Sequence, residues 1–306
     1  MVPAAAHRPR AEVAVKNSGG AAPDVSVVVP VHNAGRFIEP LLQSLAEQQT
    51  STSWELIAVD NRSTDDSRAR IERFPMPVPT RVVDAPHRPS PAYARNTGAA
   101  VARGHKLLFI DADDEVDRGY VDAMSRALDD HDFVTPRVDS TSLNAEWVRA
   151  AHGPPWQEDG LWVAFDFLPA SGSNAGVRKA HFDRIGGYPE GFVYSDDVAF
   201  SWNAHLAGAR LHFVREAVYR YRYRDSLPAL YRQGVTWGDG VTALYSHYHS
   251  KGMPGRSMRM ALDEWRSVAV GFVASRDRAT RASLMVRLGF CLGRVKGSLR
   301  RRVVYL

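Results

Sequence analysis

The chain has 306 residues, of which 44% are hydrophobic and 24% charged, enough for a sizeable buried core and an ordinary globular fold. Its single cysteine, Cys291, excludes an internal disulfide and gives no sign of a thiolate metal site. The formal net charge is +5, but residues 276–306 alone hold +8, which leaves −3 for the rest of the chain. A nucleic-acid-binding domain normally has its basic residues on the folded body, so we expect no nucleic-acid partner.

Residues 1–22 are rich in Ala, Pro, Gly and charge and lack the apolar run of about 7 residues that a secretory signal needs. We therefore expect a disordered tail there. No segment approaches the roughly 18 consecutive apolar residues of a membrane span. The expected protein is soluble and cytoplasmic, or at most peripheral at the inner face of a membrane.

Short β-branched runs alternate with segments of helical periodicity from residue 25 to about 127. Strands are predicted at 25–31, 55–60, 81–85 and 106–111. Between them we expect a helix with apolar residues from 37 to 45, a second helix ending near 73 with N-cap candidates at 63–65, and a third over 92–102. This order predicts an α/β fold with a mainly parallel sheet flanked by helices.

The alternation fades beyond residue 130, where loops rich in Trp, Gly and Pro precede a helix near 197–207. From residue 226 the pattern is mainly helical. The last helix is predicted to be basic and amphipathic, with an apolar face made of Leu284, Leu288, Cys291, Leu292, Val295 and Leu299. We expect one domain over 23–225 and a helical C-terminal extension over 226–306.

Acidic residues follow two of the predicted strands: Asp60 ends the second, and Asp111, Asp113 and Asp114 end the fourth. Ligands of open parallel sheets bind at the carboxyl ends of the strands. A few carboxylates there can share Mg²⁺ or Mn²⁺ with phosphate oxygens and water. A solvated acidic turn at the start of a helix would show the same pattern.

Five segments in this order resemble the family 2 glycosyltransferases with the GT-A fold, the Rossmann-like fold of nucleotide-diphospho-sugar transferases. They are VSVVVPVHNAGRFIEPLLQSL, ELIAVDNRSTDDS, ARNTGAA, FIDADDE, and NAGVRKAHFDRIGGYPEGF with YSDDVAFSW, and they cover about residues 24–224. The resemblance implies an inverting transfer of a sugar from a nucleoside-diphosphate donor to a hydroxyl group.

The resemblance also implies roles for single residues. Asp113 and Asp111 would hold Mn²⁺ or Mg²⁺, and Asp60 the base or ribose. The remaining donor contacts would be Pro30, Val31, His32, Asn33, Arg95, Asn96 and Ala112. His32 stands where many relatives have Tyr, and Arg95 could equally be a surface residue of its helix.

Asp197 matches the general base of the family, which deprotonates the acceptor hydroxyl. Asp196 stands where relatives usually have Glu, and the pair could instead cap the helix that starts there. Asp114, Asn174, Asp196 and Trp202 are assigned to the acceptor side or to support of the site. The three tryptophans Trp156, Trp162 and Trp202 could stack on sugar rings, although large aromatic residues lie more often in the core. Arg222 and Arg224 face either a diphosphate or solvent.

We expect the donor to be a UDP-sugar. We expect the acceptor to be an unidentified hydroxyl group of a cell-envelope or secondary-metabolite glycan. A nicotinamide dehydrogenase would need G-x-G-x-x-G after the first strand, where PVHNAGR stands. A sugar nucleotidyltransferase would need a glycine-rich basic loop at the same place. A catalytically degenerate nucleotide-sugar-binding protein stays open. The basic C-terminal helix could bind an anionic membrane or pack on the body with its charges in water.

Overall fold

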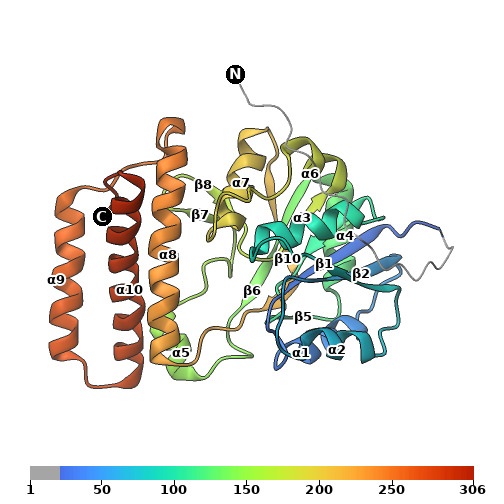
Figure 1. Ribbon diagram of the computed structural model, residues 1–306, viewed down its shortest axis with the longest axis horizontal. Helices are drawn as coiled ribbons and strands as arrows, with labels where there is room; N and C mark the ends of the chain where they lie inside the picture. The colour runs from blue at the N-terminus through green and yellow to red at the C-terminus, as the bar shows by residue number, and fades with distance from the viewer. Residues whose placement is uncertain (1–20) are drawn as a thin grey trace.

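The computed structural model describes residues 21–306. The tail expected over residues 1–22 lies outside the described residues except for Ala21 and Ala22, which are exposed. Eight strands of the described chain form one sheet in the order β3-β2-β1-β4-β9-β6-β10-β5 (Figure 1). Their bounds are β1 Val25–Val31, β2 Trp54–Asp60, β3 Thr80–Asp84, β4 Lys106–Phe109, β5 Glu115–Val116, β6 Phe133–Asp139, β9 Ala175–Arg178 and β10 Leu211–Arg220.

The sheet is mixed and mainly parallel. The pairs β1/β2, β1/β4, β2/β3 and β6/β10 are parallel, whereas β9 runs antiparallel between β4 and β6, and β5 antiparallel to β10. β1 and β2 are buried on both faces, which explains their nearly continuous apolar sequences. The predicted α/β fold class is therefore confirmed.

Helices cover both faces of this sheet. Alternate residues of β1 pack on opposite sides: Val27 and Val29 with α1 (Ile38–Ala46), α2 (Ser67–Arg73) and α4 (Tyr120–Asp130), and Val28 with α3 (Pro91–Val101), α6 (Lys179–Ile185) and α7 (Asp196–Leu206). The molecule thus has three layers in this part, as the ribbon shows (Figure 1). The period-two alternation of strand side chains produces the two separate apolar layers.

The predicted boundaries need one correction. The helix expected to be capped at residues 63–65 begins at Ser67, and its N-cap residue Asp66 makes no side-chain capping bond. The Asp65 carboxylate instead accepts hydrogen bonds from the backbone N–H groups of Gly35 and Ser67. Asp65 therefore holds the loop after β1 against the start of α2, because it offers both oxygens to backbone donors.

The remaining elements lie after β6. They are α5 (Glu146–His152), the hairpin of β7 (Trp162–Ala164) and β8 (Leu168–Ala170), α8 (Leu227–Tyr248), the 3₁₀ turn His249–Lys251, α9 (Met258–Ala274) and α10 (Arg278–Arg301). Figure 1 shows α8, α10 and α9 side by side at one end of the molecule. Among residues 21–306, the structure has no helix with the length and apolar character to cross a membrane.

Glycines allow α8 and α10 to pack closely together. A Cβ atom placed on Gly238 would lie 2.1 Å from the backbone oxygen of Phe290, and one on Gly293 would lie 2.2 Å from that of Val235. Both distances are far below van der Waals contact, so the two helix backbones approach closely only because these positions are glycine.

The apolar face predicted for the last helix is partly wrong. Leu284 and Cys291 are buried, but Leu292 is 37% and Leu299 76% exposed. Where α10 comes closest to α8 it has Gly289, Gly293 and Gly297, whose lack of a side chain gives no apolar signal in a helical pattern.

Candidate active site

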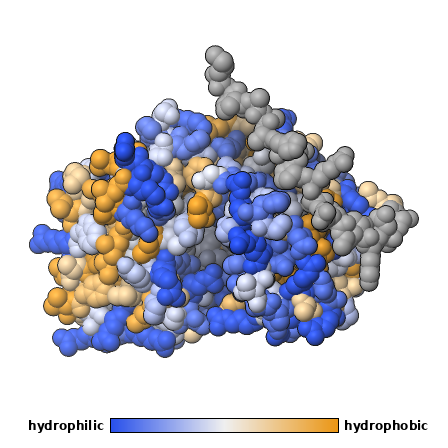
Figure 2. Space-filling view, in the orientation of Figure 1, coloured by the Kyte–Doolittle hydropathy of each residue, from blue (hydrophilic) through white to orange (hydrophobic). Residues whose placement is uncertain are grey.

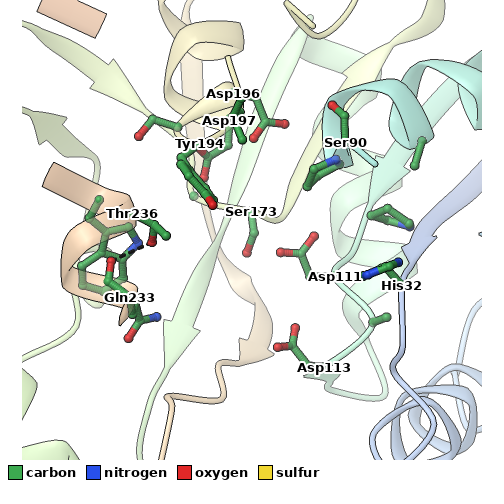
Figure 3. Close-up of a pocket in the computed structure, with 18 of the residues that line it drawn as sticks. His32, Ser90, Asp111, Asp113, Ser173, Tyr194, Asp196, Asp197, Gln233 and Thr236 are labelled. Atoms are coloured by element: carbon green, nitrogen blue, oxygen red, sulfur yellow. Dashed lines mark hydrogen bonds between the residues drawn. The ribbon is translucent and has the colours of Figure 1, made fainter. Parts of the chain in front are cut away.

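A cavity of about 1000 Å³ lies at the carboxyl ends of β1 and β4, between the sheet and α8 (Figure 3). His32 follows β1. Ser90 is the N-cap of α3, and the Ser90 hydroxyl accepts a hydrogen bond from the Tyr93 N–H. Ten of the residues predicted for the site line this cavity: Pro30, Val31, His32, Asn33, Arg95, Asp111, Ala112, Asp113, Asp196 and Asp197. These ten residues come from four separate segments of the chain, which the fold brings to one edge of the sheet.

The two carboxylates of the D-x-D segment point into this cavity (Figure 3). Asp111 lies two residues beyond the end of β4, and its backbone N–H donates to the side-chain oxygen of Asn174 at 3.0 Å. The Asp113 carboxylate accepts a hydrogen bond of 3.0 Å from the Arg224 guanidinium. Burial raises the pKa of Asp113, while Arg224 opposes the shift.

Asp114 does not line the cavity, so the structure favours support of the site over a contact to a sugar or acceptor. The residue is 1% exposed, and one carboxylate oxygen accepts from the Arg222 N–H. Burial and then the negative charge of Asp113 raise its pKa well above the ordinary value. The Arg222 guanidinium donates to the Asp113 backbone oxygen and to the Glu115 carboxylate. Arg224 lines the cavity, whereas Arg222 does not. Asp114 therefore supports the turn from behind.

Arg95 connects the two acidic parts of the site. Its guanidinium is buried and donates to Asp111 at 2.6 Å and to Asp196 at 2.7 Å. Burial alone would lower the pKa of Arg95, but the two carboxylates outweigh it and raise the pKa above its usual value. We expected a donor contact at this position; the structure shows a cation shared by two carboxylates.

Asp196 and Asp197 begin α7 and have different surroundings. Asp196 is buried and paired with Arg95, whereas Asp197 is partly exposed to the cavity. Its carboxylate accepts a hydrogen bond from the Val198 N–H at 2.8 Å, and no ion pair to Asp197 occurs within residues 21–306. Burial, and next the charge of Asp196, raise the pKa of Asp197 to about 7. Ser195 precedes the pair in the left-handed conformation with φ 61°, an uncommon backbone state for serine.

Two residues predicted to contact the donor do not line the cavity. The Asp60 carboxylate accepts from the Ser63 N–H at the end of β2, and its neighbour Asn61 lines the cavity instead. Asn96 binds both the N–H and the backbone oxygen of Tyr188, which holds the turn before α7. Both side chains therefore shape the loops around the cavity from outside.

Asn174 and Trp202, assigned to the acceptor side or to support of the site, do not line the cavity either. Asn174 is fully buried behind Asp111, and Trp202 is 0% exposed and donates its indole N–H to the Leu168 oxygen. Trp156 and Trp162, for which a core position was the more expected one, line the cavity together with Phe165. Their residue type alone could not separate the two cases, because aromatic side chains serve equally in cores and in walls.

The sequence pattern does not predict that α8 forms one wall of the cavity. Arg232, Gln233, Thr236 and Trp237 line the cavity opposite His32 and Asp113 (Figure 3). Polar residues interrupting an otherwise apolar helix were the available signal. The sequence did not show that this helix faces the cavity, since His32 and Asp113 lie more than a hundred residues earlier in the chain.

The model of the family Glycosyl transferase family 2 matches residues 26–186, more than half of the chain. The chain belongs to glycosyltransferase family 2. The uncharacterized glycosyltransferase YibD of Escherichia coli is 27% identical over 231 residues, which cover 69% of this chain and 64% of YibD. The poly(ribitol-phosphate) beta-N-acetylglucosaminyltransferase TarS of Staphylococcus aureus is 24% identical over 202 residues, 64% of this chain and 35% of TarS. The chain thus spans less than two thirds of the length of these relatives.

Two solved structures show the same fold as this family 2 chain. TarS residues 1–349 in complex with UDP-GlcNAc superpose with a TM-score of 0.57 at 18% identity, covering 92% of this chain and 93% of that one. The mannosyltransferase PcManGT of Pyrobaculum calidifontis, in complex with GDP-Man and Mn²⁺, has a TM-score of 0.59 at 17% identity, covering 90% and 87%. At such identities the likeness concerns the fold.

Proposed function

We propose that this protein transfers a sugar from a nucleoside-diphosphate donor to a hydroxyl group, with inversion at the anomeric carbon. The observation that supports it best is the position of Asp197 in the same cavity as Asp111 and Asp113. A carboxylate free to take a proton then faces the place where a donor diphosphate would lie. Family membership favours this function over a dehydrogenase or a sugar nucleotidyltransferase.

The donor end of the cavity would be formed by the loop after β1 and by Asn61. The His32 ring nitrogen Nδ1 lies 2.8 Å from the Asn61 backbone oxygen, so the imidazole is oriented with one face along the wall where a base could stack. Asn61 is held by two hydrogen bonds from its amide to the oxygens of Ala85 and Arg88. These contacts provide a preformed edge for a planar ring.

The residues at the D-x-D segment fit Mg²⁺ or Mn²⁺. Two carboxylates face the cavity, and residues 21–306 contain no group of three or more His, Cys, Asp or Glu side chains arranged for a metal. Hard divalent cations often bind through one or two carboxylates, with phosphate and water oxygens completing the shell. Asp113 and Asp111 would hold the cation, which when bound neutralises charge on the diphosphate leaving group.

Asp197 would act as the general base. Its pKa of about 7 means that the carboxylate can accept a proton from the acceptor hydroxyl near neutral pH and hold it there. The oxygen of that hydroxyl attacks the anomeric carbon as the bond to the diphosphate breaks on the opposite face. Arg95 keeps Asp196 and Asp111 in place and so orients both ends of the reaction.

The acceptor would enter along the aromatic wall. Trp156, Trp162 and Phe165 present ring surfaces, and α8 adds Arg232 and Gln233 across from them. Ring faces pack against the C–H side of sugars, while the amide and guanidinium bind hydroxyl groups. This wall supports a glycan or another hydroxyl-bearing acceptor.

UDP is the proposed nucleotide. TarS was solved with UDP and with UDP-GlcNAc, whereas PcManGT was solved with GDP-Man. Thermal stabilisation by UDP, GDP, TDP and CDP, each with and without Mn²⁺, tests the choice because a ligand that binds only the folded protein raises its Tm. Stabilisation by UDP that requires metal supports the proposal; no shift with any of the four nucleotides would contradict it and favour a different donor.

A further inference from the structure

α9 exposes an apolar face that nothing in the described chain covers. Only Ala261 and Val268 of this helix are buried. Met258, Leu262, Phe272 and Val273 are 56%, 63%, 39% and 90% exposed. Together with Trp265 and Ala269, these positions follow one another at spacings of four and three residues, which places them on a single face of the helix.

α10 extends this face. Leu288, Leu292, Val295 and Leu299 follow the same spacing, and Leu292 and Leu299 are among the exposed large apolar residues. The two helices run antiparallel side by side, and hydrophobic surface gathers over the end of the molecule where they lie (Figures 1 and 2). We call the surface formed by these residues of α9 and α10 the α9–α10 face.

Basic residues border the α9–α10 face. Arg266 follows Leu262 by one helical turn, Arg281 precedes Leu288 by two turns, and Lys296 follows Leu292 by one turn, all three exposed. Residues 258–306 contain eleven Arg or Lys and three Asp or Glu. A second copy of the chain docked there would bring two such basic rims together, whereas an anionic surface is complementary to them.

We propose that the α9–α10 face binds the surface of an anionic lipid bilayer. An apolar face of a helix with a basic border lies in the interface of a bilayer, its apolar side chains below the headgroups and its cations among them. The helices are too polar to cross the membrane, so the contact is peripheral. This binding goes beyond the proposed transfer reaction and does not depend on it.

The orientation of the face has a consequence for access to the site. Figure 2 shows a hollow between α8 and the sheet on the same side of the molecule as the apolar surface of α9 and α10. A bilayer bound to the α9–α10 face would therefore lie on the side to which the cavity opens. If the proposed function holds, an acceptor anchored in that bilayer is the substrate class this geometry favours.

Flotation of the full chain with vesicles tests the binding. One set of vesicles is phosphatidylcholine alone and the other is phosphatidylcholine mixed with phosphatidylglycerol. The protein is expected to float with the anionic set and much less with the neutral set. Leu262→Glu combined with Val273→Glu should lower the bound fraction at least about tenfold, because both the apolar insertion and the basic border are weakened.

A matched control separates the face from net charge. Met260→Glu combined with Leu206→Glu adds the same two charges at positions 50% and 49% exposed, and Met260 lies on another side of α9 than Met258. This variant should float like the parent protein, and circular dichroism should show both variants folded. The proposal is wrong if the parent protein fails to float with anionic vesicles, or if both variants bind equally. The proposal is also wrong if the parent protein is a dimer that does not bind vesicles and that becomes monomeric only in the Leu262→Glu, Val273→Glu variant. That result would identify the α9–α10 face as an interface between two copies of the chain.

Discussion

Asp197→Asn removes a carboxylate whose charged form is destabilised by its surroundings in the cavity. The pKa of Asp197 is raised from 3.8 to about 7, by burial first and by Asp196 second. A raised carboxyl pKa means that the folded protein binds more protons than the unfolded chain between about pH 4 and 7, so stability falls as the pH rises through that window. Above pH 7 the full shift of about three units corresponds to a ceiling of about 4 kcal/mol. Because the side chain is partly exposed, we expect about 2 kcal/mol.

The asparagine variant should therefore be more stable than the parent above pH 7, with a difference that shrinks towards pH 4. Denaturant unfolding at a series of pH values measures it. Asp159→Asn, at a side chain 86% exposed, is the control and should give no pH-dependent difference. The same Asp197 variant should lose about 10² to 10⁴-fold in transfer while UDP binding persists.

Two results would refute this reasoning for Asp197. A stability difference that stays constant with pH means that its carboxyl group is not held near a pKa of 7. Full transfer activity of the asparagine variant means that the base is another residue. In the parent protein, kcat/KM should rise with pH and level off above about pH 7, as expected for a base that must be deprotonated to act.

Three further changes test separate parts of the structure. Arg95→Met leaves the buried Asp196 and the partly exposed Asp111 without their shared cation and should destabilise the protein by about 3 to 5 kcal/mol in denaturant unfolding; stability equal to the parent would show that the bridge is not formed. Asp113→Ala should abolish the metal-dependent part of UDP stabilisation in a thermal shift assay, and an unchanged shift would place the cation elsewhere. Gly238→Ala should cost about 1 to 3 kcal/mol because its Cβ would lie 2.1 Å from a backbone oxygen, whereas Gly119→Ala, with open space around it, should cost far less.

The strands and the acidic rim could be predicted from local patterns. β1 and β2 are buried on both faces and so are nearly continuous apolar runs, and the site acids follow from the rule that parallel strands place their carboxyl ends at one edge. Asp111 and Asp113 line the cavity as this rule implies. Asp197 also lies there, at the start of its predicted helix.

Other outcomes depended on contacts between distant segments. Asp114 turns away from the cavity because the Arg222 N–H, more than a hundred residues later, binds its carboxylate. Asn96 faces the turn at Tyr188 and Trp202 the core, although their residue types suit a binding site equally well. No local periodicity contains this information, since it concerns which surface each side chain meets.

The sequence by itself determined the order of strands and helices up to about residue 130, the family and the carboxylates at the sheet edge, because these follow from burial patterns and short spacings along the chain. Only the tertiary structure decided that α8 closes the cavity and that Arg95 joins Asp111 to Asp196. It also decided that glycines, with no side chain to mark them, form the contact of α10 with α8, which leaves the apolar residues of α9 and α10 on the outside. The physical reason is that close packing selects partners by shape across the whole fold, and shape is a property of the assembled surfaces.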